Sequence, residues 1–257
     1  MIDSLLVCVR IFKSGSQSLT RLLADAFADR RTFYLPTLLD LDGRVTRFQR
    51  LRFQRTRARN LFMRYRSTHL NGVIARIRAE ARDGDLIDGG HIPFAPLAKE
   101  IARPLKMIFI QRDPVARALS EYNYGRESQR RKNPLSRLDA GLLHKIALRR
   151  NFEGYLDFQL EHADVYGDVA CRFVGWDGAE DLRGHFERNV FHAGTLEDNE
   201  VFAARLSEKL GKPLAFPHRN RTDKADETTV SAAARAKIER LYARDFALYE
   251  WVRTNAL

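Results

Sequence analysis

Residues 13–18 combine a lysine, a glycine and three serines in a pattern that suits an anion site. They follow an apolar run over residues 5–12 and precede apolar residues at helical spacing. The glycine lets a ligand approach the backbone, the lysine brings a full charge, and the first amides of a helix attract an anion. An ordinary strand–turn–helix connection with a solvated lysine would show the same pattern. The candidate anion-binding residues here are Lys13, Ser14, Gly15, Ser16, Gln17 and Ser18.

A second candidate site combines an arginine with a serine eight residues later. Arg112 follows the apolar run 106–110, where a strand is expected to end, and Ser120 lies further along the predicted helix. Eight residues are about two helical turns, so Ser120 returns to the face on which the helix began. A guanidinium fork and a hydroxyl together suit a phosphate group. The alternative is that Arg112 pairs with Asp113 or Glu121.

His91 is the candidate general base. It follows the short predicted strand 85–88 and two glycines, and imidazole titrates close to neutral pH. On these grounds alone, a loop histidine bonded to a backbone carbonyl is the simpler interpretation.

The two phosphate-type segments together resemble the sulfotransferase superfamily, whose donor is 3′-phosphoadenosine 5′-phosphosulfate (PAPS). In that family a K-[ST]-G-[ST]-x-S loop binds the 5′-phosphosulfate, and a later R-D-P-x-x-R-x-x-S element binds the 3′-phosphate. Residues 13–18 and 112–120 match these two motifs in the same order. The resemblance implies sulfuryl transfer without a metal ion. It implies that residues 13–18, Arg112 and Ser120 bind the donor and that Lys13 stabilises the leaving oxygen.

Two further segments resemble the glycan branch of this superfamily. The segment around His91 is similar to the glycine–histidine–x–x–aromatic element of 2-O-type glycan sulfotransferases, in which the histidine is the base. The segment 220–222 and the predicted helix after it resemble the tail of membrane-type carbohydrate sulfotransferases. The residues that carry this resemblance are Asn220, Arg221, Thr222, Tyr242, Asp245, Tyr249 and Glu250. A hydroxyl of a glycan or glycolipid is therefore the implied acceptor. Gln17 stands where relatives often carry a hydroxyl. The R-K-G-x-x-G loop of the cytosolic small-molecule enzymes is absent, and the candidates for an equivalent cover over the donor are Arg219, Asn220, Arg221 and Lys224. Other branches of the superfamily use a carboxylate as the base, for which the candidates here are Asp40, Asp42 and Asp88.

The apolar pattern predicts an α/β fold that can position these loops. Strands are expected at residues 5–12, 32–35, 85–88, 106–110 and 169–174. One helix is expected to begin at Ser16 or Ser18, either of which can cap it. Further helices are expected at residues 73–82, 97–102, 114 onward, 199–210 and 231–252. This alternation indicates a P-loop-like parallel sheet with helices on both faces, in a single domain over residues 1–257. The expected site lies at the carboxyl ends of the strands, in the loops after residues 12, 88, 110 and 174.

The formal net charge of +11 is concentrated in one segment. Residues 44–82 contain 12 arginines and one acid, and therefore carry the whole excess. We interpret this segment as a helical insert that contacts an anionic acceptor or a membrane surface, or as a solvated, partner-docking face. A nucleic-acid-binding module is disfavoured, because no recognition motif accompanies the arginines. A P-loop-type kinase is disfavoured too, since the Walker order and a magnesium-binding aspartate are missing.

The overall composition is that of a soluble globular protein, with 44% hydrophobic and 30% charged residues in 257. No signal peptide or membrane-spanning run is recognised, so a cytoplasmic protein is expected. Cys8 and Cys171 are expected to be buried thiols rather than a disulfide, and they provide no cluster of metal ligands. The sequence leaves the oligomeric state open.

Overall fold

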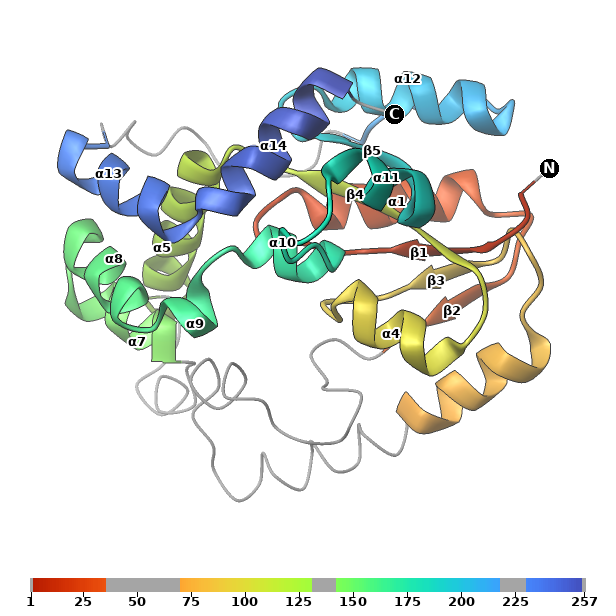
Figure 1. Cartoon of the computed structure of the whole chain (residues 1–257), viewed down its shortest axis with the longest axis horizontal. Coiled ribbons are helices and arrows are strands. Elements are labelled where there is room, and N and C mark those ends of the chain that lie inside the picture. Colours follow the sequence, from red (N-terminus) through yellow and green to blue (C-terminus); the bar gives the residue numbers. More distant parts are fainter. Residues whose placement is uncertain (1, 36–69, 131–141, 218–229, 256–257) are drawn as a thin grey trace.

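The computed structural model describes residues 2–35, 70–130, 142–217 and 230–255, apart from the side chains of 128–130. Within these ranges the chain forms a five-stranded sheet in the order β2-β3-β1-β4-β5 (Figure 1). All four strand pairs are parallel. The predicted α/β fold with a parallel sheet is therefore confirmed. The strands are β1 (Leu5–Cys8), β2 (Thr32–Tyr34), β3 (Leu86–Asp88), β4 (Leu105–Gln111) and β5 (Val190–Thr195).

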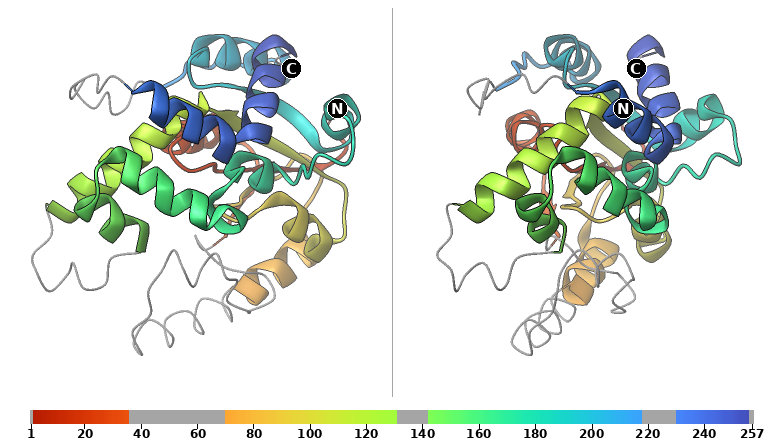
Figure 2. Two further views of the ribbon diagram at one scale, coloured as in Figure 1. Left: turned by 60° about the vertical axis from the view of Figure 1, so that its left-hand side comes forward. Right: turned by 90° about the vertical axis from the view of Figure 1, so that its left-hand side faces the viewer.

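Helices cover both faces of the sheet because the strand residues alternate between two apolar clusters. Leu5 and Val7 belong to one cluster, and Leu6 and Cys8 to the other. The second cluster is covered by α1 (Ser16–Ala26) and α12 (Asn199–Leu210). The opposite face carries α4 (Phe94–Ile101), and Figure 2 shows α1 and α4 on opposite sides of the sheet. The remaining helices are α5 (Pro114–Arg130), α7 (Leu142–Arg149), α8 (Phe152–Glu161), α9 (Ala163–Tyr166), α10 (Val169–Val174), α11 (Leu182–Asn189), α13 (Ala232–Leu241) and α14 (Ala243–Asn255).

The end of the arginine-rich segment packs into the larger cluster. Residues 70–80 are helical, and their apolar face, which includes Leu70 and Ile77, is buried. Two arginines on this helix form exposed ion pairs, Arg76 with Glu80 at 3.7 Å and Arg78 with Glu100 at 3.2 Å. This part of the segment is therefore fixed by its apolar face. Residues 44–69, which hold nine of the 12 arginines, lie outside the described residues.

The strand predicted at residues 169–174 is wrong, because these residues form the helix α10. The Asp245 carboxylate accepts hydrogen bonds from the amides of Ala170 (3.1 Å) and Cys171 (2.9 Å), which satisfies the first turn of the helix. Gly175, with a φ of 75°, ends it. The fifth strand is instead β5, which pairs with β4. The loop after Thr195 therefore takes the place that was expected for the loop after residue 174.

The predicted helix 231–252 is in fact two helices, α13 and α14, that meet at Tyr242. The backbone of Tyr242 leaves the helical range, with φ −123° and ψ 35°. Asp168 accepts hydrogen bonds from the amides of Arg244 (2.9 Å) and Asp245 (3.3 Å), which caps the start of α14. A contact distant in the sequence thus divides one continuous helical pattern. Asp168 lies more than 70 positions before the break.

Three smaller expectations have clear outcomes. The N-cap of α1 is Gly15, and neither predicted cap, Ser16 nor Ser18, holds that place. Cys8 and Cys171 are both buried and free, as expected. Among the helices in the described ranges, none combines the length and the hydropathy that a membrane span requires.

Candidate functional site

Three of the four expected loops meet at the carboxyl edge of the sheet. β1 is the central strand of the three, with Cys8 in register with Asp88 of β3 on one side and with Ile108 of β4 on the other. The chain after each of these strands therefore leaves the sheet at the same edge. This arrangement brings residues 13–18, His91 and Arg112 into one region, as the sequence predicted.

The loop before α1 has the features of an anion cradle. Gly15 has a φ of 73° and, as the N-cap, offers no side chain to the first amides of α1. Ser14 is 1% exposed, and its Oγ has no hydrogen-bond partner among the described residues. A buried hydroxyl without a partner is costly unless a ligand satisfies it. Ser18 is buried, Ser16 is half-buried and Gln17 is exposed. These observations fit a negatively charged group bound at the start of α1.

Gly15 is required by both its backbone angle and its surroundings. A Cβ on Gly15 would lie 2.6 Å from Cδ1 of Leu196, in the loop after β5. We expect Gly15→Ala to lower the free energy of unfolding by about 1–2 kcal/mol, mainly from the left-handed backbone and to a smaller extent from displacement of the Leu196 side-chain tip. Urea denaturation measures this loss.

Gly211→Ala is the matched control for this prediction. Gly211 also has a positive φ, of 63°, but no atom lies within 4 Å of its Cβ position. This variant is expected to lose only the backbone contribution, about 1 kcal/mol. Equal losses in the two variants would show that the contact with Leu196 contributes nothing.

The second loop positions Arg112 at the end of β4, beside the start of α5. Arg112 and Ser120 are both half-buried. Asp113, proposed as one alternative partner of Arg112, instead accepts a hydrogen bond from the amide of Ala116 at 2.8 Å and caps α5. Arg117, the second arginine of the motif, has its partner in the protein core. It is buried and forms an ion pair with Asp245 at 2.6 Å.

Lys13 connects the first loop to α5. Its Nζ lies 4.1 Å from the centre of the Tyr124 ring, a cation–π contact. Burial lowers the pKa of Lys13, Glu121 opposes this effect, and the positive charge of Arg112 lowers the pKa further. The charges of Lys13 and Arg112 are therefore close enough to influence each other. Two nearby cations favour an anion that interacts with both.

His91 is held in one orientation by a hydrogen bond and by aromatic rings. Its Nδ1 lies 2.7 Å from the carbonyl oxygen of Arg10. The ring stacks on Phe12 at 4.1 Å and meets the edge of Phe173 at 6.4 Å. A carbonyl oxygen only accepts, so Nδ1 donates, and the lone pair of the neutral ring lies on Nε2. A structural histidine would make this carbonyl contact, and the same contact orients a base.

The alternative bases differ in what the structure says of them. Asp88 is buried, lies 3.4 Å from Arg10 in an ion pair and accepts a hydrogen bond from the amide of Gly90 at 3.1 Å. These contacts give Asp88 a structural role beside the His91 loop. The other two carboxylates and the candidate cover over the donor lie outside the described residues, namely Asp40, Asp42, Arg219, Asn220, Arg221 and Lys224.

Sequence reasoning missed Glu197, because it missed β5. Glu197 accepts a hydrogen bond from the amide of Asp113 at 3.4 Å, and its other carboxylate oxygen lies 3.4 Å from the Tyr249 hydroxyl. Desolvation raises the pKa of Glu197, and the nearby Arg112 opposes that shift. The loop after β5 therefore borders the Arg112 loop. The β-branched residues at the two ends of β5, Val190 and Thr195, were the available signal.

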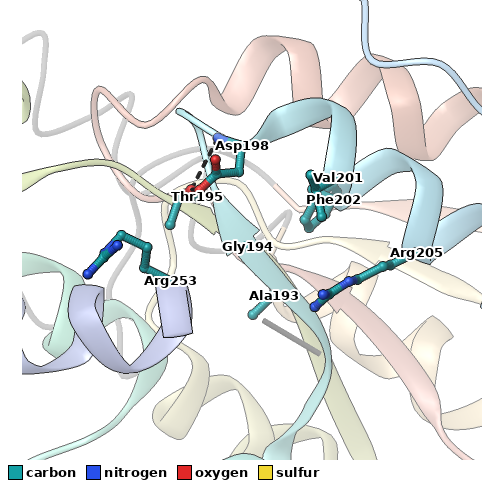
Figure 3. A pocket seen from close by; sticks show the side chains of 8 residues that line it. All are labelled: Ala193, Gly194, Thr195, Asp198, Val201, Phe202, Arg205 and Arg253. Carbon is teal, nitrogen blue, oxygen red and sulfur yellow. Dashed lines mark hydrogen bonds between the residues drawn. The ribbon is translucent and has the colours of Figure 1, made fainter. Parts of the chain in front are cut away.

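A small pocket lies beside the edge strand β5 (Figure 3). Thr195 and Asp198 are hydrogen-bonded at 2.7 Å at its rim. None of the candidate residues named from the sequence lines this pocket, so we place the site in the three loops instead. The lining includes Gly194, Thr195, Asp198, Phe202, Arg205 and Arg253.

The chain also matches a known protein family. Residues 3–183 match the model of the sulfotransferase domain family. The match covers more than half of the chain and includes both phosphate-type loops and His91. A search of curated proteins gave no match.

Proposed function

We propose a function for this chain from one premise, which is that the chain belongs to the sulfotransferase domain family and is a sulfotransferase. Membership favours sulfuryl transfer over the kinase and nucleic-acid alternatives, and it implies PAPS as the donor. Our proposal assigns this chain's residues to that donor. Residues 13–18 bind the 5′-phosphosulfate, and Arg112 and Ser120 bind the 3′-phosphate.

The observation that carries this assignment is the unsatisfied anion cradle before α1. The buried Ser14 hydroxyl has no partner within the described ranges, and the first amides of α1 have no side-chain cap. Arg112 begins the loop of the neighbouring strand, within electrostatic reach of Lys13. The residues present therefore fit a ligand with two separated anionic groups. Such a donor supplies the sulfuryl group and leaves as a nucleotide.

We assign the proton transfer to His91 and charge stabilisation to Lys13. His91 Nε2 accepts the proton of the acceptor hydroxyl, while the carbonyl of Arg10 fixes the ring through Nδ1. Lys13 faces the negative charge that develops on the leaving oxygen. In the structure the Lys13 ammonium lies over the Tyr124 ring, at the boundary between the two loops assigned to the donor.

We further propose that the acceptor is a hydroxyl of a carbohydrate or glycolipid, and that it carries negative charge. The support is the excess of arginine in residues 44–82, which is separate from the residues assigned to the donor. Of these arginines, Arg76 and Arg78 already pair with acids of the same chain. We assign the acceptor contacts to the nine arginines of this segment before residue 70, where most of the excess charge lies.

Nucleotide-dependent thermal stabilisation tests the donor assignment. At about 100 times its Kd, 3′-phosphoadenosine 5′-phosphate is expected to stabilise the protein by about 2.7 kcal/mol, or about 5–10 °C in Tm. ATP with magnesium is expected to give a much smaller shift. Arg112→Ala should reduce the shift from the bisphosphate nucleotide, because it removes the fork assigned to the 3′-phosphate. No shift, or an equal shift with ATP and magnesium, would contradict the proposal.

A further inference from the structure

Asp245 is a fully buried carboxylate at the junction of three elements. It lies on α14, and its carboxylate bonds Arg117 of α5 and two amides of α10. One carboxylate oxygen accepts hydrogen bonds from Arg117 Nη2 (2.6 Å) and the Ala170 amide (3.1 Å), and the other accepts from the Cys171 amide (2.9 Å). The side chains of Arg117 and Asp245 are 3% and 0% exposed. A charged pair removed from water in this way is rigid because each hydrogen bond is costly to lose.

The same residue binds the end of β4 through its backbone. Gln111 Nε2 donates to the carbonyl oxygen of Asp245 at 3.0 Å. The guanidinium of Arg117 lies 4.4 Å from the centre of the Tyr242 ring, which is itself buried. α14 is therefore joined to the strand and the helix on either side of the Arg112 loop.

The residues that contact Asp245 are close in the sequence to those assigned to the donor. Gln111 immediately precedes Arg112, and Arg117 lies on α5 between Arg112 and Ser120. On the other side, α10 carries Phe173, which packs edge-on against Phe12 at 5.3 Å and against His91. Asp245 thus bonds both the element that carries the 3′-phosphate residues and the element that supports the ring of His91.

We propose that Asp245 is a positioning residue for the donor, which holds Arg112 and Ser120 at a fixed place relative to residues 13–18. This inference rests on the proposed function, because it takes the 3′-phosphate assignment as given. The family match ends at residue 183, so Asp245 lies beyond the segment that the match covers. A phosphate receptor must be held within a fraction of an ångström of its bound geometry, and Asp245 provides the support from behind.

The test compares two nucleotides that differ only in the 3′-phosphate. The Kd values of 3′-phosphoadenosine 5′-phosphate and adenosine 5′-phosphate are measured for wild type and for Asp245→Asn. The preference for the bisphosphate is expected to fall about tenfold in the variant, since displaced receptor groups bind poorly. The affinity for adenosine 5′-phosphate should remain within about twofold, because residues 13–18 do not contact Asp245. An equal loss of affinity for both nucleotides would identify a merely structural role and overturn the inference.

Asp85→Asn is the matched control. Asp85 is also a buried carboxylate that accepts hydrogen bonds from backbone amides, those of Arg82 (2.8 Å) and Arg31 (3.4 Å), but it lies at the amino end of β3. Its replacement is expected to lower Tm and to leave the nucleotide preference unchanged. A fall in preference as large as that of Asp245→Asn would overturn the inference, since any lost buried carboxylate would then have the same effect.

A second variant keeps the test decisive if Asp245→Asn does not fold. The double variant Arg117→Gln/Asp245→Asn leaves no buried charge without a partner. The glutamine side chain is shorter than that of arginine, so it cannot restore the contact with residue 245. It is expected to fold and to show the same loss of preference. A folded double variant with the wild-type preference overturns the inference.

Arg112→Ala separates this inference from the proposed function. If Arg112→Ala loses the preference and Asp245→Asn keeps it, the 3′-phosphate assignment stands and the positioning role is wrong. If wild type shows no preference, or Arg112→Ala retains it, the 3′-phosphate assignment fails and the inference fails with it.

Discussion

Replacement of His91 by alanine is expected to reduce turnover by about a hundred- to ten-thousand-fold, the usual contribution of a general base. The affinity for 3′-phosphoadenosine 5′-phosphate should stay within about twofold, because His91 lies outside both donor loops. The reason for the loss is geometric. The ring is fixed by the carbonyl of Arg10 and by Phe12, and alanine leaves no basic nitrogen at the position of its Nε2. Rates are measured with labelled PAPS and the acceptor that reacts best among glycans, glycolipids and phenols.

Two variants distinguish a base from a histidine that only supports its loop. His91→Asn retains an N–H that can donate to the Arg10 carbonyl but has no basic nitrogen, so its turnover should be as low as that of the alanine variant. Wild-type turnover in His91→Asn would reject the base assignment. His162→Ala is the matched control, since His162 also has Nδ1 bonded to a carbonyl oxygen, that of Phe158 at 3.0 Å, beside an aromatic ring. It should retain full turnover.

The local structure of the two phosphate-type loops could be predicted because their information is local. Residues 13–18 are consecutive, and the αL glycine, the helix start and the preceding buried strand all fall within about 15 positions. The same holds for Arg112, since Pro114 and the Asp113 cap are adjacent to it. In parallel sheets the carboxyl ends of neighbouring strands share an edge, so local predictions were sufficient to bring the two loops together.

The elements that failed are those decided by distant partners. Residues 169–174 are uniformly apolar apart from Arg172, and a short buried strand and a short buried helix have the same composition. The amide contacts with Asp245, more than 70 positions away, stabilise the helix over the strand. The strand β5 was not predicted because a polar residue lies within it. Its buried His192 interrupts the apolar pattern and is accommodated only because its Nε2 is hydrogen-bonded to the carbonyl of Phe202 at 2.9 Å.

Arg117 shows a limit of reading roles from a motif. Within the segment 112–120 it has the same residue type as Arg112, and both are cations on one short stretch of chain. Only burial separates them, because Arg117 points into the core toward Asp245 while Arg112 remains half-buried at the sheet edge. The partner that determines this difference lies on α14, so the local sequence could not reveal it.

Lys13→Ala is expected to lower kcat by about a hundred- to a thousand-fold, which is the effect of removing one preorganised group that stabilises developing charge. Arg112→Ala is the informative comparison. Arg112 is assigned to a phosphate that does not change during transfer, so its loss should raise the Kd of the donor and leave kcat at saturating donor nearly unchanged. Equal losses of kcat in the two variants would contradict the division of roles between Lys13 and Arg112.

The pH dependence gives an independent test of Lys13. Burial and the charge of Arg112 lower the pKa of Lys13, so its positive charge is lost as the pH rises, and at a lower pH than for an exposed lysine. The kcat/KM for the donor should therefore fall on the alkaline side, because this ratio reports ionisations of the free enzyme. Lys13→Arg should retain partial activity and remove that alkaline decrease, since a guanidinium stays charged over the whole accessible range. An alkaline decrease that persists unchanged in Lys13→Arg would assign the ionisation to another group and would remove this support for Lys13 as the cation at the leaving oxygen.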